Sequence, residues 1–135
     1  MRITQEADYA LRIMLFLSKS GEGARIDART ISENQSVSLR FTLKILRKLT
    51  QAGLTQSFRG INGGYSLNKS LEEINLKIVI EAIDGAVHIN RCLHDPEACN
   101  KKATASCEIH HELSRIQKML LKELEEANFK KLLNK

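Results

Sequence analysis

Apolar residues recur every three or four positions in several stretches of this chain, a spacing that predicts amphipathic helices. The first such stretch covers residues 4–20. A short helix over residues 28–34 follows, capped by Asp27, and a polar turn leads to a second helix over residues 38–52, capped by Ser38. For this second helix we expect an inward stripe made of Leu39, Thr42, Leu43, Leu46 and Leu49.

Short alternating segments come directly after these helices. Residues 54–58 and 65–67 alternate apolar and polar side chains as strands do, and residues 59–64 between them are rich in glycine and contain an arginine. The pattern predicts a β-hairpin with a basic tip. Two helices joined by a tight turn and followed by such a hairpin form a winged helix-turn-helix, so we expect a mainly α fold with a small β-hairpin.

The second half of the chain predicts a different organisation. A further amphipathic helix, capped by Asn75, ends near Gly85, and residues 86–106 show too little periodicity for anything but a loop. Helical spacing returns over residues 108–127, and its apolar stripe consists of Leu113, Ile116, Leu120 and Leu124. This stripe could pack within the domain, but a long helix that follows a compact unit favours pairing with a second copy.

These patterns divide the chain into three parts. We expect a winged helix-turn-helix DNA-binding domain over residues 1–84, a cysteine-containing loop over residues 85–107, and a dimerisation helix with its tail over residues 108–135. The pattern leaves open whether residues 129–135 continue the long helix or fray.

The net charge of +5 is concentrated in the first half of the chain. Residues 1–70 hold 11 Lys or Arg against 5 Asp or Glu, and no acidic residue lies between Glu33 and Glu72. A segment with such an excess of positive charge indicates a surface that contacts phosphates. We expect the second helix to lie in the major groove of DNA and the hairpin tip at the minor groove. The candidate DNA-binding residues are Ser38, Arg40, Lys44, Arg59, Gly60 and Asn62.

All three cysteines of the chain fall within one short segment, at Cys92, Cys99 and Cys107, and His110 follows at a C-x-x-H spacing. Thiols and an imidazole gathered in this way indicate a metal or iron-sulfur site. The alternative without a functional site is an incidental disulfide between two of the cysteines, with the third thiol free. Because the first residues contain no apolar run typical of a secretory signal, we expect a cytoplasmic protein with reduced thiols. No apolar stretch approaches the roughly 20 residues that cross a bilayer, so we expect no membrane partner.

Two further uses of the cysteine segment stay open at this point. A thiol-redox switch or a zinc-stabilised loop would keep the DNA-binding domain without a cluster, although structural zinc sites usually contain a closely spaced cysteine pair. A hydrolase with Cys99 or Cys107 as nucleophile, beside His110 or His111, is a remote alternative, because no triad or phosphate loop accompanies these residues. We therefore expect no enzyme.

Several short motifs carry a resemblance that spans nearly the whole chain. They are Arg2-Ile3-Thr4, Asp8-Tyr9-Ala10-Leu11-Arg12, Leu43-Lys44-Ile45-Leu46, Ala52-Gly53-Leu54, the segment from Arg59 to Tyr65, and the three cysteines. With them the chain resembles the bacterial iron-sulfur regulators related to IscR and to the nitric-oxide sensor NsrR, which are dimeric winged-helix repressors. The hairpin segment and the three cysteines identify this group of regulators only when they occur together.

The resemblance implies an iron-sulfur cluster held by Cys92, Cys99 and Cys107 with one ligand that is not cysteine. His110 matches the histidine that completes a 2Fe-2S site in IscR-like members. Asp8 matches the carboxylate that NsrR-like members donate, from the partner subunit, to a 4Fe-4S cluster. The spacing of the cysteines is slightly wider than in either group, so the resemblance leaves both ligands and both cluster types open.

Each candidate fourth ligand also has an ordinary structural explanation. Asp8 could pair with Arg12 one helical turn away, and His110 could be an exposed histidine at a helix start, with His88, His94 and His111 nearby. The expected function is that of a homodimeric repressor that binds palindromic double-stranded DNA. Its affinity would respond to the cluster, and through it to iron-sulfur status, iron, oxidants or nitric oxide.

Overall fold

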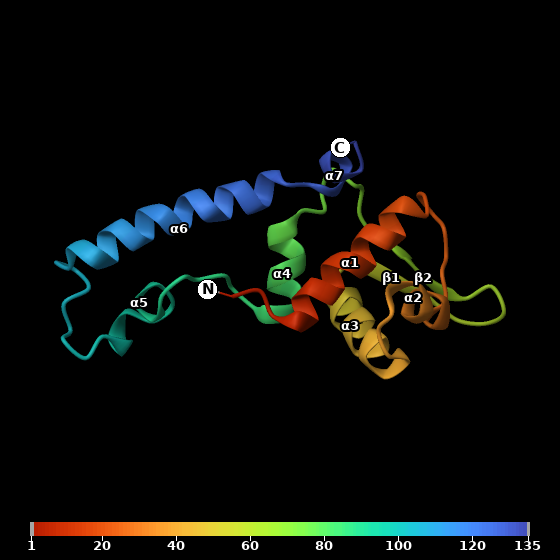
Figure 1. Ribbon diagram of the computed structural model, residues 1–135, viewed down its shortest axis with the longest axis horizontal. Coiled ribbons are helices and arrows are strands. Elements are labelled where there is room, and N and C mark those ends of the chain that lie inside the picture. Colours follow the sequence, from red (N-terminus) through yellow and green to blue (C-terminus); the bar gives the residue numbers. More distant parts are fainter. Residues whose placement is uncertain (1, 135) are drawn as a thin grey trace.

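The computed structural model describes residues 2–134, which form a compact head and a protruding arm (Figure 1). We call residues 2–84 together with the C-terminal helix the head, and residues 85–126 the arm. The elements, in chain order, are α1 (Gln5–Lys19), α2 (Ala28–Gln35), α3 (Leu39–Gln51), β1 (Thr55–Phe58), β2 (Gly64–Leu67), α4 (Leu76–Asp84), α5 (Arg91–His94), the 3-10 helix η1 (Pro96–Ala98), α6 (Glu108–Glu126) and α7 (Phe129–Leu133).

Four helices of the head begin at the polar residues that the sequence predicts. The side chain of Thr4 accepts the backbone N–H of Ala7, and Asp27, Ser38 and Asn75 make the equivalent bond at the starts of α2, α3 and α4. Each cap satisfies one of the backbone donors that a helix start leaves without an internal partner. These starts are therefore fixed by local chemistry.

The hydrophobic core lies where α1, α3 and α4 pack together, with α2 and the hairpin closing its edges. The predicted stripe of α3 is wrong at one position. Leu43 is exposed, and Ile45 is fully buried beside Thr42, Leu46 and Leu49. Residues 42, 45, 46 and 49 share one face of a helix at 3.6 residues per turn, which leaves residue 43 on the outer side.

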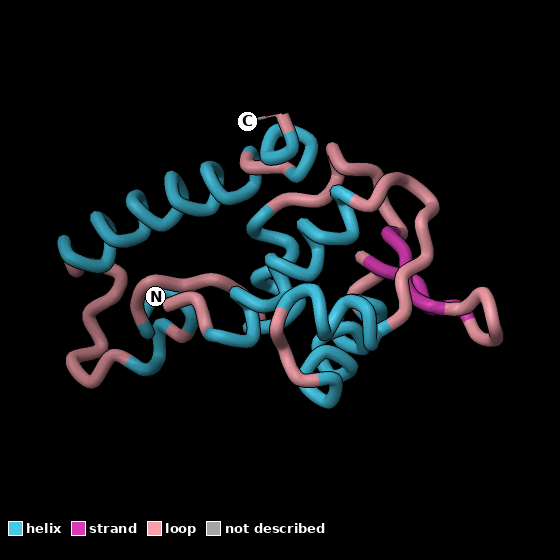
Figure 2. The backbone as a smooth tube through the Cα atoms, turned by 45° about the vertical axis from the view of Figure 1, so that its right-hand side comes forward, coloured by secondary structure: helices cyan, strands magenta, loops and turns pink. Residues whose placement is uncertain are grey.

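The predicted hairpin is present, and it projects from the head (Figure 2). Strands β1 and β2 are antiparallel, with Thr55 opposite Leu67 and Phe58 opposite Gly64. A single bridge between Ile26 and Tyr65 adds a third piece of backbone near the turn end of the hairpin. Strand β2 of the wing is therefore tied to the segment that precedes α2.

The last described residues return to the head, an arrangement that the sequence left undecided. After α6 the chain bridges Asn128 to Asn75, and the N–H of Phe129 donates to the carbonyl of Ile74 at 2.8 Å. The side chain of Phe129 is 1% exposed and belongs to the core. Residues 129–133 form a separate short helix that completes the head.

The side chains of the arm are less buried than those of the head. The loop that was expected to lack regular structure contains α5 and η1, and the 19-residue helix α6 has no buried residue. Ile116 and Met119 on this helix are 41% and 58% exposed. Among residues 2–134, no helix combines the length and the apolar character needed to cross a membrane.

Candidate DNA-reading face and cysteine pocket

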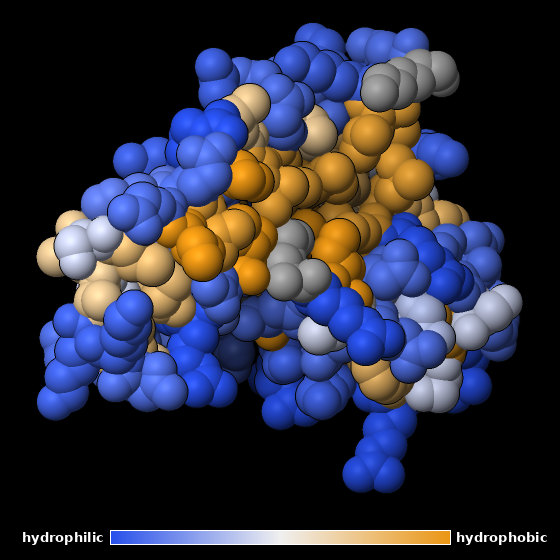
Figure 3. Space-filling view, turned by 60° about the vertical axis from the view of Figure 1, so that its left-hand side comes forward, coloured by the Kyte–Doolittle hydropathy of each residue, from blue (hydrophilic) through white to orange (hydrophobic). Residues whose placement is uncertain are grey.

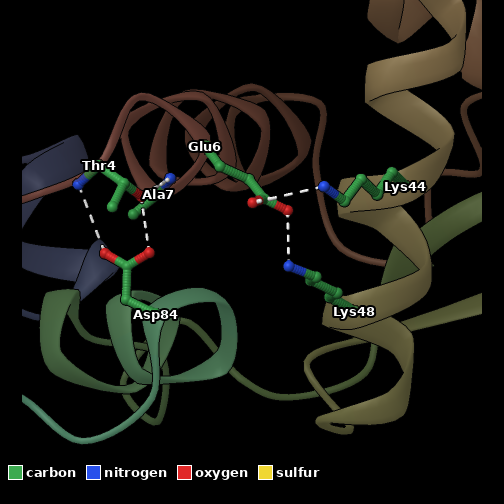
Figure 4. Close-up of polar contacts among 6 residues, drawn as sticks. All are labelled: Thr4, Glu6, Ala7, Lys44, Lys48 and Asp84. Atoms are coloured by element: carbon green, nitrogen blue, oxygen red, sulfur yellow. Dashed lines mark hydrogen bonds and ion pairs between the residues drawn. The ribbon is translucent and has the colours of Figure 1, made fainter.

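Helix α3 presents its basic side chains on the surface of the head. Ser38 caps the helix, and both Arg40 and Lys44 in its first two turns are exposed. Lys44 lies 3.9 Å from a carboxylate oxygen of Glu6 on α1, and Lys48 lies 2.8 Å from the other (Figure 4). Glu6 thus holds the middle of α3 against α1, while Arg40 extends from its beginning.

The tip of the wing is a tight turn that carries the predicted residues Arg59, Gly60 and Asn62, all exposed. Gly60 adopts a φ of +93°, a region that side chains rarely enter, and its carbonyl accepts the N–H of Gly63 at 3.0 Å. At the base of the turn, the guanidinium of Arg25 stacks 3.6 Å from the ring centroid of Phe58. Sequence analysis did not single out Arg25, because this stacking depends on the bridge that joins its loop to the hairpin.

The three cysteines and His110 line one pocket of about 580 Å³ in the arm. All three thiols are free and half-buried. The Nδ1 atom of His110 lies 3.1 Å from the sulfur of Cys92, and the backbone N–H of His110 donates to the sulfur of Cys107 at 3.5 Å. The structure therefore brings together the four candidate ligands that one chain can supply, from α5, η1 and the start of α6.

Backbone donors act on one of these thiols in particular. The N–H groups of Ala103 and Lys101 point toward the sulfur of Cys99 and lower its pKa, since they stabilise the thiolate. Lys102 between them has a φ of +53°, and its own N–H donates to the carbonyl of Cys99 at 3.0 Å, so the chain turns tightly around Cys99. The thiolate is the form that binds metals, so this turn favours Cys99 as a ligand.

The donor set is one that an iron-sulfur cluster can use. Among residues 2–134, no three His, Cys, Asp or Glu side chains converge closely enough to hold one metal ion. A cluster distributes its protein ligands over different irons, so they need not meet at one point. Three thiols and an imidazole around a pocket of this size fit such a group chemically.

The other candidate ligands lie outside this pocket. Asp8 is exposed on α1, and within residues 2–134 it forms no ion pair with Arg12, whose guanidinium instead donates to the carbonyl of Gln35 and lies over Tyr9. His88 and His94 stack on each other with ring centroids 4.4 Å apart. Asp8 therefore lies on a free face of the head, within this one chain.

A hydrogen-bonded contact connects the beginning of the arm to α1. The hydroxyl of Thr4 donates to one carboxylate oxygen of Asp84 at 2.6 Å, and the backbone N–H of Thr4 lies 3.4 Å from the other (Figure 4). Asp84 is the last residue of α4, directly before the arm. Thr4, the N-cap of α1, thus bonds to the last residue of the head before the arm, and Glu6 on α1 pairs with two lysines of α3.

A protein-family model for Rrf2, described as an iron-dependent transcriptional regulator, matches residues 3–135. The chain belongs to the Rrf2 family. The resemblance to IscR- and NsrR-type regulators is thereby confirmed, since members named IscR and NsrR are among the relatives.

Three relatives illustrate the likeness within the Rrf2 family. An HTH-type transcriptional regulator of Haemophilus influenzae is 31% identical over 89% of this chain and 81% of its own length. IscR of Aliivibrio salmonicida is 35% identical over 73% of this chain and 58% of its own length. NsrR of Bacillus licheniformis is 29% identical over 70% of this chain and 66% of its own length. The chain thus spans a little over half of the IscR relative. All three names denote transcriptional regulators, in agreement with the expectation that this Rrf2 protein is not an enzyme.

Solved structures support the fold of the Rrf2 protein. A transcriptional regulator from Listeria innocua superposes with a TM-score of 0.80 at 26% identity, over 99% of this chain and 87% of the other. IscR of T. potens superposes with a TM-score of 0.72 at 18% identity, over 99% and 87%. The mainly α winged-helix fold with one hairpin is confirmed.

Proposed function

We propose that this Rrf2 protein is a homodimeric repressor whose affinity for a palindromic DNA operator responds to an iron-sulfur cluster in the arm. The observation that carries the proposal is the pocket shared by Cys92, Cys99, Cys107 and His110, which opens beside the start of α6. A cluster of the 2Fe-2S type is the first choice, with 4Fe-4S as the alternative.

DNA binding rests on the charge and exposure of α3 and the wing. Arg40 and Lys44 are exposed on α3, Arg59 is exposed at the wing tip, and no acidic residue interrupts the segment that connects them. Phosphates attract such a surface, and a helix of this kind fits the major groove while the wing reaches the minor groove. Ser38, Gly60 and Asn62 complete the proposed contacts, because all three are exposed and carry polar backbone or side-chain groups.

The distance of 3.1 Å between His110 and Cys92 supports His110 as the fourth ligand. Asp8 of the partner subunit remains the competing ligand, since Asp8 is exposed on α1 and available to a second copy. When bound, an iron-sulfur cluster supplies iron that reacts with oxidants and nitric oxide, and a ligand weaker than thiolate leaves one iron easier to attack or lose.

The loop that carries the pocket, residues 85–107, is connected to the rest of the protein at three points. Cys107 is the N-cap of α6, the N–H of Ile89 donates to Gln117 on α6 at 2.9 Å, and Asp84, directly before the loop, accepts from Thr4, the N-cap of α1. Ordering or release of the loop would therefore change how α6 and α1 are held. The cysteine pocket and the DNA-binding surface would thus be two distinct sites that both act on the position of α6 and α1, as allostery requires.

Dimerisation rests on the unburied apolar stripe of α6. None of the 19 residues of α6 is fully buried in one chain and Ile116 is 41% exposed, whereas most helical stability in proteins comes from packing of the apolar face. Figure 3, with the arm turned forward, shows apolar side chains gathered on this side of the molecule. A second copy of the same face would cover it and would set two reading heads on one two-fold operator.

The cluster is tested by purifying the protein without oxygen and recording its visible absorption, iron and sulfide. We expect a coloured protein with iron and sulfide in similar amounts, and loss of colour in Cys92→Ser, Cys99→Ser and Cys107→Ser. His110→Ala should weaken or shift the absorption, whereas the neighbouring His111→Ala should leave it unchanged. If Asp8→Ala bleaches the protein and His110→Ala does not, the partner's carboxylate is the ligand. Stoichiometric zinc, or no metal at all, would overturn the cluster proposal.

DNA binding is tested separately by the salt dependence of affinity. Arg59→Ala should weaken binding and reduce the slope of log affinity against log salt by about 2 for the proposed dimer, because each subunit loses one phosphate-neutralising charge. Lys118→Ala on the arm removes the same charge away from the reading face and should leave the slope unchanged. Equal slopes in both variants would contradict the role of the wing.

A further inference from the structure

The wing tip exposes one large apolar side chain more completely than any other part of residues 2–134. The side chain of Ile61 is 104% exposed, while the other large apolar residues on the surface range from 41% to 69%. Exposed apolar area of this kind gains nothing from folding, since hydrophobic stabilisation comes from area removed from water. Its position between Arg59 and Asn62 therefore calls for a partner outside the chain.

The turn that carries Ile61 is held in one shape. The carbonyl of Gly60 accepts the N–H of Gly63, and a Cβ atom added to Gly63 would lie only 2.5 Å from the carbonyl oxygen of Phe58. A Cβ atom on Gly64 would meet the backbone of Ile26 at 2.8 Å, so the strand end next to the turn is packed backbone against backbone. Ile61 is thus presented on a rigid support, which lowers the entropy that binding would remove.

The charges around Ile61 select the class of partner. Arg59 precedes it, Arg25 is stacked on Phe58 at the base of the turn, and no acidic residue lies between Glu33 and Glu72. An apolar protein surface would have to accommodate these two arginines beside the contact with Ile61. The minor groove of DNA accommodates both the cations and the apolar side chain, because its edges are phosphates and its walls are the apolar faces of the sugars.

We propose that Ile61 is a specificity-determining residue, which enters the minor groove beside Arg59 and selects A·T over G·C pairs there. An A·T pair shows only acceptors on the floor of the minor groove, whereas a G·C pair adds the guanine N2 amino donor. An isoleucine over that amino group would remove it from water without offering an acceptor, and a buried donor without a partner is unfavourable. This inference rests on the proposed DNA binding by the wing and adds the base pair that the wing prefers.

The experiment begins with an operator selected from a random DNA pool by the wild-type protein. Positions contacted by the wing are those whose protection from hydroxyl radicals is lost in Arg59→Ala at saturating protein. At these positions A·T pairs are replaced either by G·C or by inosine·cytosine, which lacks the N2 amino group but otherwise keeps the G·C pattern. We expect G·C to weaken binding about 10-fold and inosine·cytosine to bind like A·T.

Variants of Ile61 then assign the preference to this side chain. Ile61→Ala should bind G·C and A·T operators within about two-fold of each other, and Ile61→Asn, whose carbonyl can accept from N2, should favour G·C. Ile109→Ala, another exposed isoleucine but on α6, is the matched control and should keep the wild-type preference. Because Ile61 has no packing role, the melting temperature of Ile61→Ala should equal that of the wild type.

The outcomes separate this inference from the proposed function. If the wild type selects no sequence from the pool, DNA binding itself fails. If it selects an operator but treats A·T, inosine·cytosine and G·C alike at the wing positions, or if Ile61→Ala keeps the full preference, only the role of Ile61 is overturned.

Discussion

The head and the arm differ in what holds them together. The head encloses a core in which residues of α1, α3 and α4 and Phe129 of α7 are almost completely buried. In the arm, α6 has no buried residue, and the loop before it contributes only Val87 to the buried apolar residues. The head is therefore stabilised by its own packing, whereas the arm is organised by local hydrogen bonds and leaves both its pocket and its apolar stripe available.

This difference suits the proposed combination of a fixed DNA-reading surface with a cluster-responsive arm. A reading helix must be rigid to match the spacing of base edges, and α3 meets that need because Thr42, Ile45, Leu46 and Leu49 anchor it in the core. A sensing segment must change at small free energy, and elements with few buried contacts are the ones that open most easily. The proposed cluster and the proposed second copy both act on the arm, where little packing opposes them.

The largest expected effect tests whether α7 belongs to the head. Phe129→Ala should lower the free energy of unfolding by about 3–5 kcal/mol, because it removes a fully buried aromatic ring and leaves a cavity. Ile109→Ala, in the arm, should change it by less than about 0.5 kcal/mol. Urea denaturation followed by circular dichroism measures both. Equal effects would show that the head and the arm do not differ in this way.

The second test places a charge on the apolar stripe of the arm. Ile116→Glu should weaken the proposed dimer by about 2 kcal/mol or more, since it removes an apolar contact and introduces a charge. Sedimentation velocity over a concentration series gives the dissociation constant. Lys118→Glu changes charge on the same helix away from Ile116 and serves as the control. A wild-type protein that sediments as a monomer over the whole series would contradict the proposed dimer.

The third test compares two helix caps, one in each region. Ser38→Ala should lower the free energy of unfolding by about 1 kcal/mol, because the first turn of α3 loses its capping hydroxyl. Cys107→Ala at the start of α6 should leave the unfolding of the cluster-free protein nearly unchanged, since α6 supports no core. Thermal melting of metal-free samples distinguishes the two, and a larger loss for Cys107→Ala would contradict the division into head and arm.

The smallest effect concerns Glu6, which connects α1 to the reading helix. Glu6→Gln should raise DNA affinity a few-fold at low salt, because Lys44 and Lys48 lose a competing carboxylate, and the gain should shrink as salt screens the charges. Stability should fall by less than about 1 kcal/mol, as is usual for an ion pair near the surface. Glu126→Gln, at the end of α6, is the control. Unchanged or weaker binding in Glu6→Gln would show that the ion pair positions the lysines for DNA.

The sequence predicted the head well because its signals are local. Caps such as Thr4 and Ser38 sit next to the backbone groups that they satisfy, and the glycines of the wing mark the turn that they form. The burial of Ile45 in place of Leu43 was missed, because both are apolar and only the rotation of α3 against α1 decides between them.

The arm and α7 were less predictable because their structure depends on distant contacts. No pattern in residues 129–135 indicates that Phe129 would insert beneath α1 and hydrogen-bond to Ile74. Helices α5 and η1 are too short for a periodic signal, and Asn90 and Asp95 that start them resemble ordinary loop residues. The candidate ligands could be named from residue type and resemblance, whereas their meeting in one pocket required the fold.

The insertion of Phe129 has a consequence for the order of folding. In the sequence, the whole arm lies between two segments of the head. The core is therefore completed only when the chain closes a long loop and Phe129 returns to Ile74. Loop closure becomes less favourable only slowly with length, but contacts between distant residues form late and slow the reaction. An arm that is already ordered by pairing would bring Phe129 back sooner. Refolding of the head should therefore accelerate with protein concentration, although every atom of its core comes from one chain.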